Sequence, residues 1–179
     1  MKKILVCLFL FTSVLVNAQT YLPSEQGSKL HFVIKNLGIN TGGDVKGLKG
    51  KIIFDSKNTA RCFFDVTVAV KTIDTDNGKR DEHLRKEEYF NVETYPVIHL
   101  VSTKIEPGAD LKHFVFKGNL TIKNITKPIS FPFSAEGKSG GALFVGSFDI
   151  NRIDFGVGKE SFSLSNRVKI TLNAFAKTQ

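Results

Sequence analysis

The sequence predicts an all-β protein with one domain, folded as a closed barrel or a sandwich of eight antiparallel strands. Apolar and polar residues alternate with a period of two in eight runs after residue 28, which is the pattern of strands with one buried face. Turn-forming residues separate the runs, and most connections are short. Because no internal repeat or low-complexity linker divides the chain, we expect one all-β domain.

The first 18 residues predict a secretory signal peptide. Two lysines precede an apolar run from Ile4 to Val16, and the small residue Ala18 stands at the expected cleavage position. The apolar run is shorter than the roughly 20 residues that a membrane-spanning helix needs. Cleavage after Ala18 leaves residues 19–179 as the mature domain. For this domain we expect a periplasmic or secreted location and no integral membrane segment.

Four runs carry the strand pattern clearly, and four carry it more weakly. The clear runs are residues 62–71, 114–123, 129–135 and 167–177. The weaker runs are residues 30–35, 45–54, 97–104 and 143–150. Gly47 and Gly50 inside the run 45–54 predict a bulge or a sharp bend, which a sheet needs in order to curl closed.

One short helix is predicted in the long connection that ends at Tyr95-Pro96. Asn77-Gly78 predicts a turn, and the ten residues after it contain no β-branched residue, glycine or proline. Within this helix the pairs Asp81–Arg85 and Glu82–Lys86 have the favourable acid-first order at i,i+4. We therefore expect two ion pairs on the helix surface.

The charged segment RDEHLR of this helix, residues 80–85, favours a scaffolding role over chemistry. Zinc needs several His or Cys ligands at workable spacing, and His83 is the only such residue in the segment. The chain has no predicted strand-to-helix turn that carries a serine nucleophile, because its G-x-S-x-G match at residues 137–141 lies between two strand runs. We therefore expect no enzyme activity, no metal and no cofactor.

Charge and cysteine content argue against a nucleic-acid-binding protein and against a fold that disulfides stabilise. The formal charge of +8 falls to +6 when the two signal-peptide lysines are removed, and no basic cluster is interleaved with aromatic residues, so we expect no nucleic-acid partner. Cys62 is the only cysteine of the mature domain, so no intrachain disulfide can form. Its place in an alternating apolar run predicts a buried thiol without a functional role.

The interior of an eight-stranded barrel is wide enough either to be filled by side chains or to hold one slender ligand. Sixteen phenylalanines and no tryptophan predict an apolar interior. Aromatic residues on strands ordinarily form core, so the pattern alone favours a packed interior over a ligand tunnel.

Several motifs together resemble the YceI-like family. They are Ile73-Asp74-Thr75, the RDEHLR segment, Tyr89-Phe90-Asn91-Val92 with Tyr95-Pro96, GNLTIKNITKPISF at 118–131 and NRIDFGVG at 151–158. The resemblance implies an extended, lipocalin-like, eight-stranded antiparallel barrel with a short helix between strands. It also implies a periplasmic or secreted protein that holds a polyisoprenoid or another long-chain lipid, without firm enzyme activity. Asn91 departs from the aspartate that is common in the family.

With this resemblance a ligand tunnel replaces the packed interior as the expectation, and the inward strand faces become its lining. The expected lipid-binding residues are Phe32, Ile34, Phe64, Val66, Val68, Phe114, Phe116, Leu120, Phe131, Phe133, Phe148, Ile150, Val168 and Ile170. The helix and residues 151–166 are expected to cover the mouth of the tunnel. We expect Arg152 to belong to a structured turn, with a carboxylate or phosphate contact as the alternative.

Two other function classes are kept as alternatives. The first is a lipid-modifying enzyme that uses His83 and Asp81 as acid and base. The second is a packed barrel that binds a protein partner through an exposed apolar patch, for which Phe63 and Phe175 on the outer strand faces are the candidates. The sequence leaves the oligomeric state open, a homodimer included. It also leaves open which lipid is bound, and whether that lipid is carried, stored or sensed.

Overall fold

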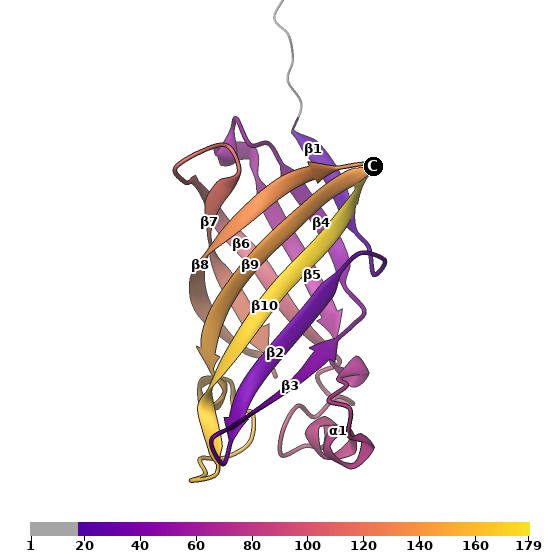
Figure 1. Cartoon of the computed structure of the whole chain (residues 1–179), viewed down its shortest axis with the longest axis vertical. Helices are drawn as coiled ribbons and strands as arrows, with labels where there is room; N and C mark the ends of the chain where they lie inside the picture. The colour runs from indigo at the N-terminus through magenta and orange to yellow at the C-terminus, as the bar shows by residue number, and fades with distance from the viewer. Residues whose placement is uncertain (1–17) are drawn as a thin grey trace, which may run out of the picture.

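A computed structural model describes residues 18–179, which form ten strands and one α-helix (Figure 1). The strands are β1 (Gln19–Pro23), β2 (Lys29–Asn36), β3 (Ile39–Val45), β4 (Lys49–Phe54), β5 (Phe63–Ala69), β6 (Val97–Pro107), β7 (His113–Ile122), β8 (Ile125–Lys138), β9 (Gly141–Asn151) and β10 (Leu164–Thr178). The helix is α1 (Gly78–Arg85), and 3₁₀ turns lie at Thr59–Arg61, Val70–Thr72 and Arg152–Phe155. The predicted signal peptide lies outside the described residues except for Ala18.

Eight of the strands close into an antiparallel barrel. Their order around the wall is β1-β4-β5-β6-β7-β8-β9-β10, and β10 pairs again with β1 through Tyr21↔Thr178. The two additional strands extend one end of the wall: β2 pairs with the first part of β10, and β3 pairs with β2. The predicted eight-stranded barrel with one short helix is therefore confirmed, with two further strands. Within residues 18–179 no helix has the length and hydropathy to cross a bilayer.

The additional strands correct one predicted run. Residues 45–54 were expected as one strand, but β3 ends at Val45 and β4 begins at Lys49. Gly47 and Gly50 have φ angles of 78° and 125°, which residues with a side chain rarely adopt, so the chain bends where the glycines predict a bend. The turn between β2 and β3 also has positive φ, at Leu37 and Gly38, as the tight two-residue hairpin turn requires.

The packed core fills the β1 end of the barrel. A cluster of buried residues that we call the aromatic cluster is formed by Tyr21, Ile52, Phe54, Phe64, Ile105, Phe114, Phe116, Phe131, Phe133, Ala135, Ala142, Phe144 and Ala176. Phe54 makes edge-to-face contacts with Phe114 and Phe144, at ring-centre distances of 5.0 and 5.3 Å. The cluster lies at the end of the barrel where β1 pairs with the end of β10, which is the upper end in Figure 1, and its side chains fill that end.

Candidate functional site

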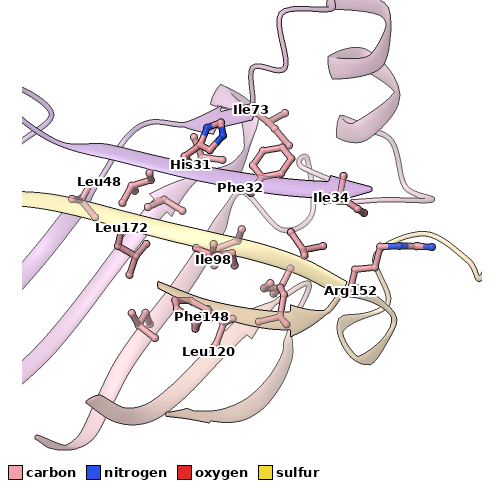
Figure 2. A pocket seen from close by; sticks show the side chains of 18 of the residues that line it. His31, Phe32, Ile34, Leu48, Ile73, Ile98, Leu120, Phe148, Arg152 and Leu172 are labelled. Carbon is pink, nitrogen blue, oxygen red and sulfur yellow. The ribbon is translucent and has the colours of Figure 1, made fainter. Parts of the chain in front are cut away.

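A cavity of about 380 Å³ lies inside the barrel, beyond the aromatic cluster and toward α1. All ten strands contribute to its wall, and most of the side chains that face it are aliphatic or aromatic. Figure 2 shows this wall from close by, with Phe32, Ile98, Leu120 and Phe148 projecting from four different strands. The volume falls in the range of about 300–1,000 Å³ that is typical of small-molecule sites. The barrel interior is thus packed with aromatic side chains at the β1 end, while toward α1 the cavity lies beside a second buried cluster of Leu120, Ile122, Phe155 and Val157.

The mouth of the cavity lies between the end of β2 and α1. Asn36 and His83 are the lining residues that are exposed to solvent, and they belong to these two elements. Arg80 and Tyr89 line the cavity on the same side, and the rings of His83 and Tyr89 lie 4.9 Å apart. A ligand therefore has an apolar interior and a polar entrance with cationic and hydrogen-bonding groups.

Thirteen of the fourteen residues expected to bind lipid line this cavity. They are Phe32, Ile34, Phe64, Val66, Val68, Phe116, Leu120, Phe131, Phe133, Phe148, Ile150, Val168 and Ile170. Phe114 is the exception, because it is only 1% exposed and packs inside the aromatic cluster, beyond the closed end of the cavity. Contact of the thirteen with a lipid stays a prediction.

Other lining residues were missed by the sequence analysis. Four of them, Leu30, Ile98, Leu100 and Leu172, lie on inward faces of predicted strands, so the alternation of apolar and polar residues could have identified them. Further lining residues lie outside the alternating parts of the strands: Leu48, Ile73, Tyr89, Phe90 and Val157 are in connections, Leu84 is in α1, and Leu164 is the first residue of β10. The mouth was expected beside the helix, but Asn36 and His83 were not named among the residues that line it.

The RDEHLR segment fixes the wall of the mouth. Asp81 is buried, and its Oδ1 accepts hydrogen bonds from the backbone N–H and the hydroxyl of Thr75, at 3.0 and 2.5 Å. Arg80 donates to the hydroxyl and the carbonyl of Thr75. Arg85 donates to the carbonyls of Lys71 and Ile73. The segment thus holds residues 71–75 against α1, which supports the scaffolding interpretation.

The two ion pairs expected on α1 are not among those of the described residues. Asp81 and Arg85 turn to the partners just named, and Glu82–Lys86 does not occur among the contacts within 4.0 Å. The Asp81–Arg85 prediction was wrong because a buried backbone segment offers stronger hydrogen bonds than a solvated i,i+4 pair does. The Glu82–Lys86 prediction was wrong because the helix ends at Arg85, and Lys86 has an extended backbone that breaks the i,i+4 geometry.

Arg152 organises the other loop beside the cavity. Its side chain is 3% exposed and donates to the carbonyls of Val157, Lys159, Leu164 and Ser165, and to the side-chain oxygen of Asn166. Burial lowers the pKa of the Arg152 guanidinium from its ordinary value. The expected structured turn is present, with Gly156 at a φ of 64°. These acceptors satisfy the guanidinium inside the protein, so the turn does not depend on an added anion.

The outer face offers less apolar surface than the alternative of a protein-binding barrel needs. Phe63 is 39% exposed, but Phe175 is only partly exposed. The ring of Phe175 lies against Gly27, where an added Cβ would be 3.3 Å from the Phe175 Cβ. The connection between β1 and β2 therefore shields Phe175.

Sequence comparison relates the chain to bacterial proteins. A family model described as the YceI-like domain matches residues 21–176. A UPF0312 protein of Pseudomonas aeruginosa (strain LESB58) is 30% identical over 173 residues, which cover 92% of this chain and 90% of the relative. The UPF0312 protein of Enterobacter sp. (strain 638) is 31% identical over 174 residues, which cover 92% and 89%.

Solved structures share the barrel. BcnA of Burkholderia cenocepacia superimposes with a TM-score of 0.81 at 23% identity, covering 87% of this chain and 99% of BcnA. A polyisoprenoid binding domain from Saccharophagus degradans superimposes with a TM-score of 0.70 at 13% identity, covering 90% and 99%. At these identities the likeness concerns the fold. Together with the match over residues 21–176, it establishes that this chain belongs to the YceI-like family.

Proposed function

We propose that this protein binds one long-chain lipid, of the polyisoprenoid or a related class, with its apolar chain inside the barrel cavity. The observation that carries the proposal is an apolar cavity that is closed by the aromatic cluster at one end and open beside α1 at the other. The chain enters through the mouth with its tail first, and the head group stays between Asn36 and His83. The polyisoprenoid binding domain with the same fold supports this ligand class.

Burial of the lipid chain supplies the free energy of binding. Each methylene group removed from water contributes about 0.8 kcal/mol, so ten contribute about 8 kcal/mol before the cost of ordering the chain is subtracted. Such a gain is sufficient to keep a lipid out of water during transport or storage. Residues 1–18 support a role in the periplasm or outside the cell.

Binding without catalysis accounts for the polar groups at the mouth better than an acid–base pair does. Asp81 uses Oδ1 for Thr75, and the hydrogen bonds of the described residues include none between Asp81 and His83. His83 instead packs against Tyr89. Neither residue is poised to exchange a proton with the other, so we propose that His83 contributes to the wall of the entrance.

Mass spectrometry of an organic extract from the gently purified mature protein tests the proposal. We expect close to one isoprenoid or fatty lipid per protein, also visible as added mass in the native complex. Ile34→Trp fills the cavity near the mouth, where Ile34 pairs with Val168, and should lower lipid content at least about tenfold.

Val33→Trp is the matched control, because Val33 is the neighbouring residue on β2 and does not line the cavity. It should keep the lipid. The proposal fails if the protein is empty and takes up no added isoprenoid, or if Ile34→Trp carries as much lipid as the control.

A further inference from the structure

The three most exposed large apolar side chains of the described residues gather at the mouth. Leu37 and Ile39 are 77% and 71% exposed, and Phe162 is fully exposed. We call these three residues the rim cluster. The next most exposed residue of this kind, Leu111, lies in the connection between β6 and β7 at the closed end of the barrel.

Two segments bring the rim cluster together. Leu37 lies in the turn between β2 and β3, and Ile39 is the first residue of β3; Asn36 and Thr41, on either side of them, line the cavity. Phe162 precedes Leu164, another lining residue, by two positions. The backbone N–H of Leu37 donates to the carbonyl of Ser163 at 2.6 Å, so the two segments touch. Figure 1 shows them side by side at the lower end of the barrel, beyond β2 and β10.

The rim cluster does not serve the folded core. Its side chains face water, where they gain nothing from burial. Leu37 also has a φ of 49°, a left-handed conformation in which glycine or asparagine is more favourable than leucine. Exposed apolar residues are unfavourable at such a turn, and they are expected there only where a binding surface requires them.

We infer that the rim cluster inserts into the interface of a lipid bilayer and turns the mouth toward the acyl chains. This inference rests on the proposed function, because a long-chain lipid resides in a bilayer and needs a dry path into the cavity. The exposed charges next to the cluster, Lys35, Lys159 and Glu160, are mixed in sign. Apolar insertion therefore contributes more than attraction to anionic head groups.

A bilayer fits this surface better than a protein partner does. A stable protein interface buries roughly 800 Å² on each side. Three side chains on two protruding tips do not supply such an area. A bilayer interface, in contrast, accepts individual aromatic and aliphatic side chains at its boundary with water. The position of the cluster at the cavity mouth gives this insertion a direct use, because a lipid then passes between bilayer and barrel without crossing water.

Sedimentation of the mature protein with phosphatidylcholine vesicles tests the inference. We expect the protein to sediment with the vesicles, and the variant Leu37→Asn, Ile39→Thr, Phe162→Ser to lose at least about fivefold in partitioning. Asn suits the positive φ at position 37, and Thr keeps a β-branched residue in β3. Leu111→Ser is the matched control at the closed end and should bind vesicles like the unchanged protein. Anionic lipid should increase binding only modestly.

Lipid extraction and sedimentation velocity on the same samples separate the outcomes. A triple variant that retains its lipid but neither binds vesicles nor delivers labelled lipid to them at the original rate supports the inference. Absence of vesicle binding by the unchanged protein overturns it, even if that protein carries lipid. Equal vesicle binding by the triple variant overturns it as well. A dimer that the triple variant dissociates, without vesicle binding, would assign the cluster to a second copy instead. An empty protein that still binds vesicles through the cluster would contradict the proposed function and not the surface.

Discussion

At the scale of single residues, Arg152 shows how the fold holds a charge beside an apolar cavity. Its five acceptors are backbone carbonyls and one amide oxygen, which come from residues 157–166. Hydrogen bonds that involve a charged group contribute about 1.5–3 kcal/mol each, so together they offset the cost of burial. The side chain thereby ties the loop after β9 to the start of β10.

Replacement of Arg152 tests this role. Lysine keeps the charge but has a single nitrogen, so it cannot reach acceptors on both sides of the loop. We expect Arg152→Lys to lower the free energy of unfolding by about 3 kcal/mol, measured by urea denaturation. Arg167→Lys is the control, because the Arg167 side chain is exposed and pairs only with Asp149 at the surface. Its effect should stay within about 0.5 kcal/mol. Similar losses in both variants would contradict the role of Arg152.

At the scale of elements, the strands show which features a sequence can predict. Period-two alternation located eight strands, because each of them has one apolar face. It missed β1, which is only five residues long and ends at Pro23, and β3, in which Gly42 and Gly43 interrupt the apolar pattern. These strands form because their backbones pair with β10, β4 and β2. Pairing of this kind depends on tertiary contacts that no local pattern contains.

The alternation predicts which face of the sheet a side chain lies on, but not its position along the barrel axis. Phe114 and Phe116 lie on one face of β7, yet only Phe116 lines the cavity. Position along the barrel axis depends on how far each strand slides against its neighbours, which alternation does not specify. The residues of the mouth were beyond prediction for a related reason, because only the tertiary fold places Asn36 of β2 and His83 of α1 on the same cavity.

The end of the cavity that the aromatic cluster closes, which we call its floor, should set the length of the bound chain. Phe133 lines the cavity and also belongs to the aromatic cluster. Phe133→Leu removes part of this floor, so we expect the variant to carry lipids that are longer by a few carbons, measured by mass spectrometry, at a cost of about 1–2 kcal/mol in stability. Phe114→Leu makes the same change below the floor. It should cost a similar stability and leave the lipid length unchanged; a shift in this control as well would argue against the floor as the determinant.

At the scale of the whole molecule, packed side chains occupy only part of the barrel interior, and a cavity occupies the rest. The aromatic cluster buries its side chains without a ligand, but the walls near α1 face the cavity. Atoms beside a void lose the dispersion contacts that a filled interior provides. Under the proposed function a bound lipid fills this space, so ligand content and stability should be coupled.

Removal of the lipid tests this coupling. A ligand present at 100 times its Kd stabilises the folded state by about 2.7 kcal/mol, which corresponds to roughly 5–10 °C in Tm for a domain of this size. We expect the delipidated mature protein to unfold at a Tm lower by this amount, measured by calorimetry, and added lipid to restore it. The Ile34→Trp variant should show no change on extraction. An unchanged Tm in the unmodified protein would mean that the cavity walls are stable when empty.

The course of folding is constrained by the last strand. β10 pairs with β1, β2 and β9, and its pair Tyr21↔Thr178 joins the two ends of the described chain. Contacts between such distant residues require closure of a very long loop, which makes barrels of this kind slow to fold. During synthesis, β1, β2 and β9 each keep an unpaired edge until the fifteen residues of β10 are available. The barrel therefore stays open until β10 has been made, and chaperones or proteases can act on the unpaired edges before that point.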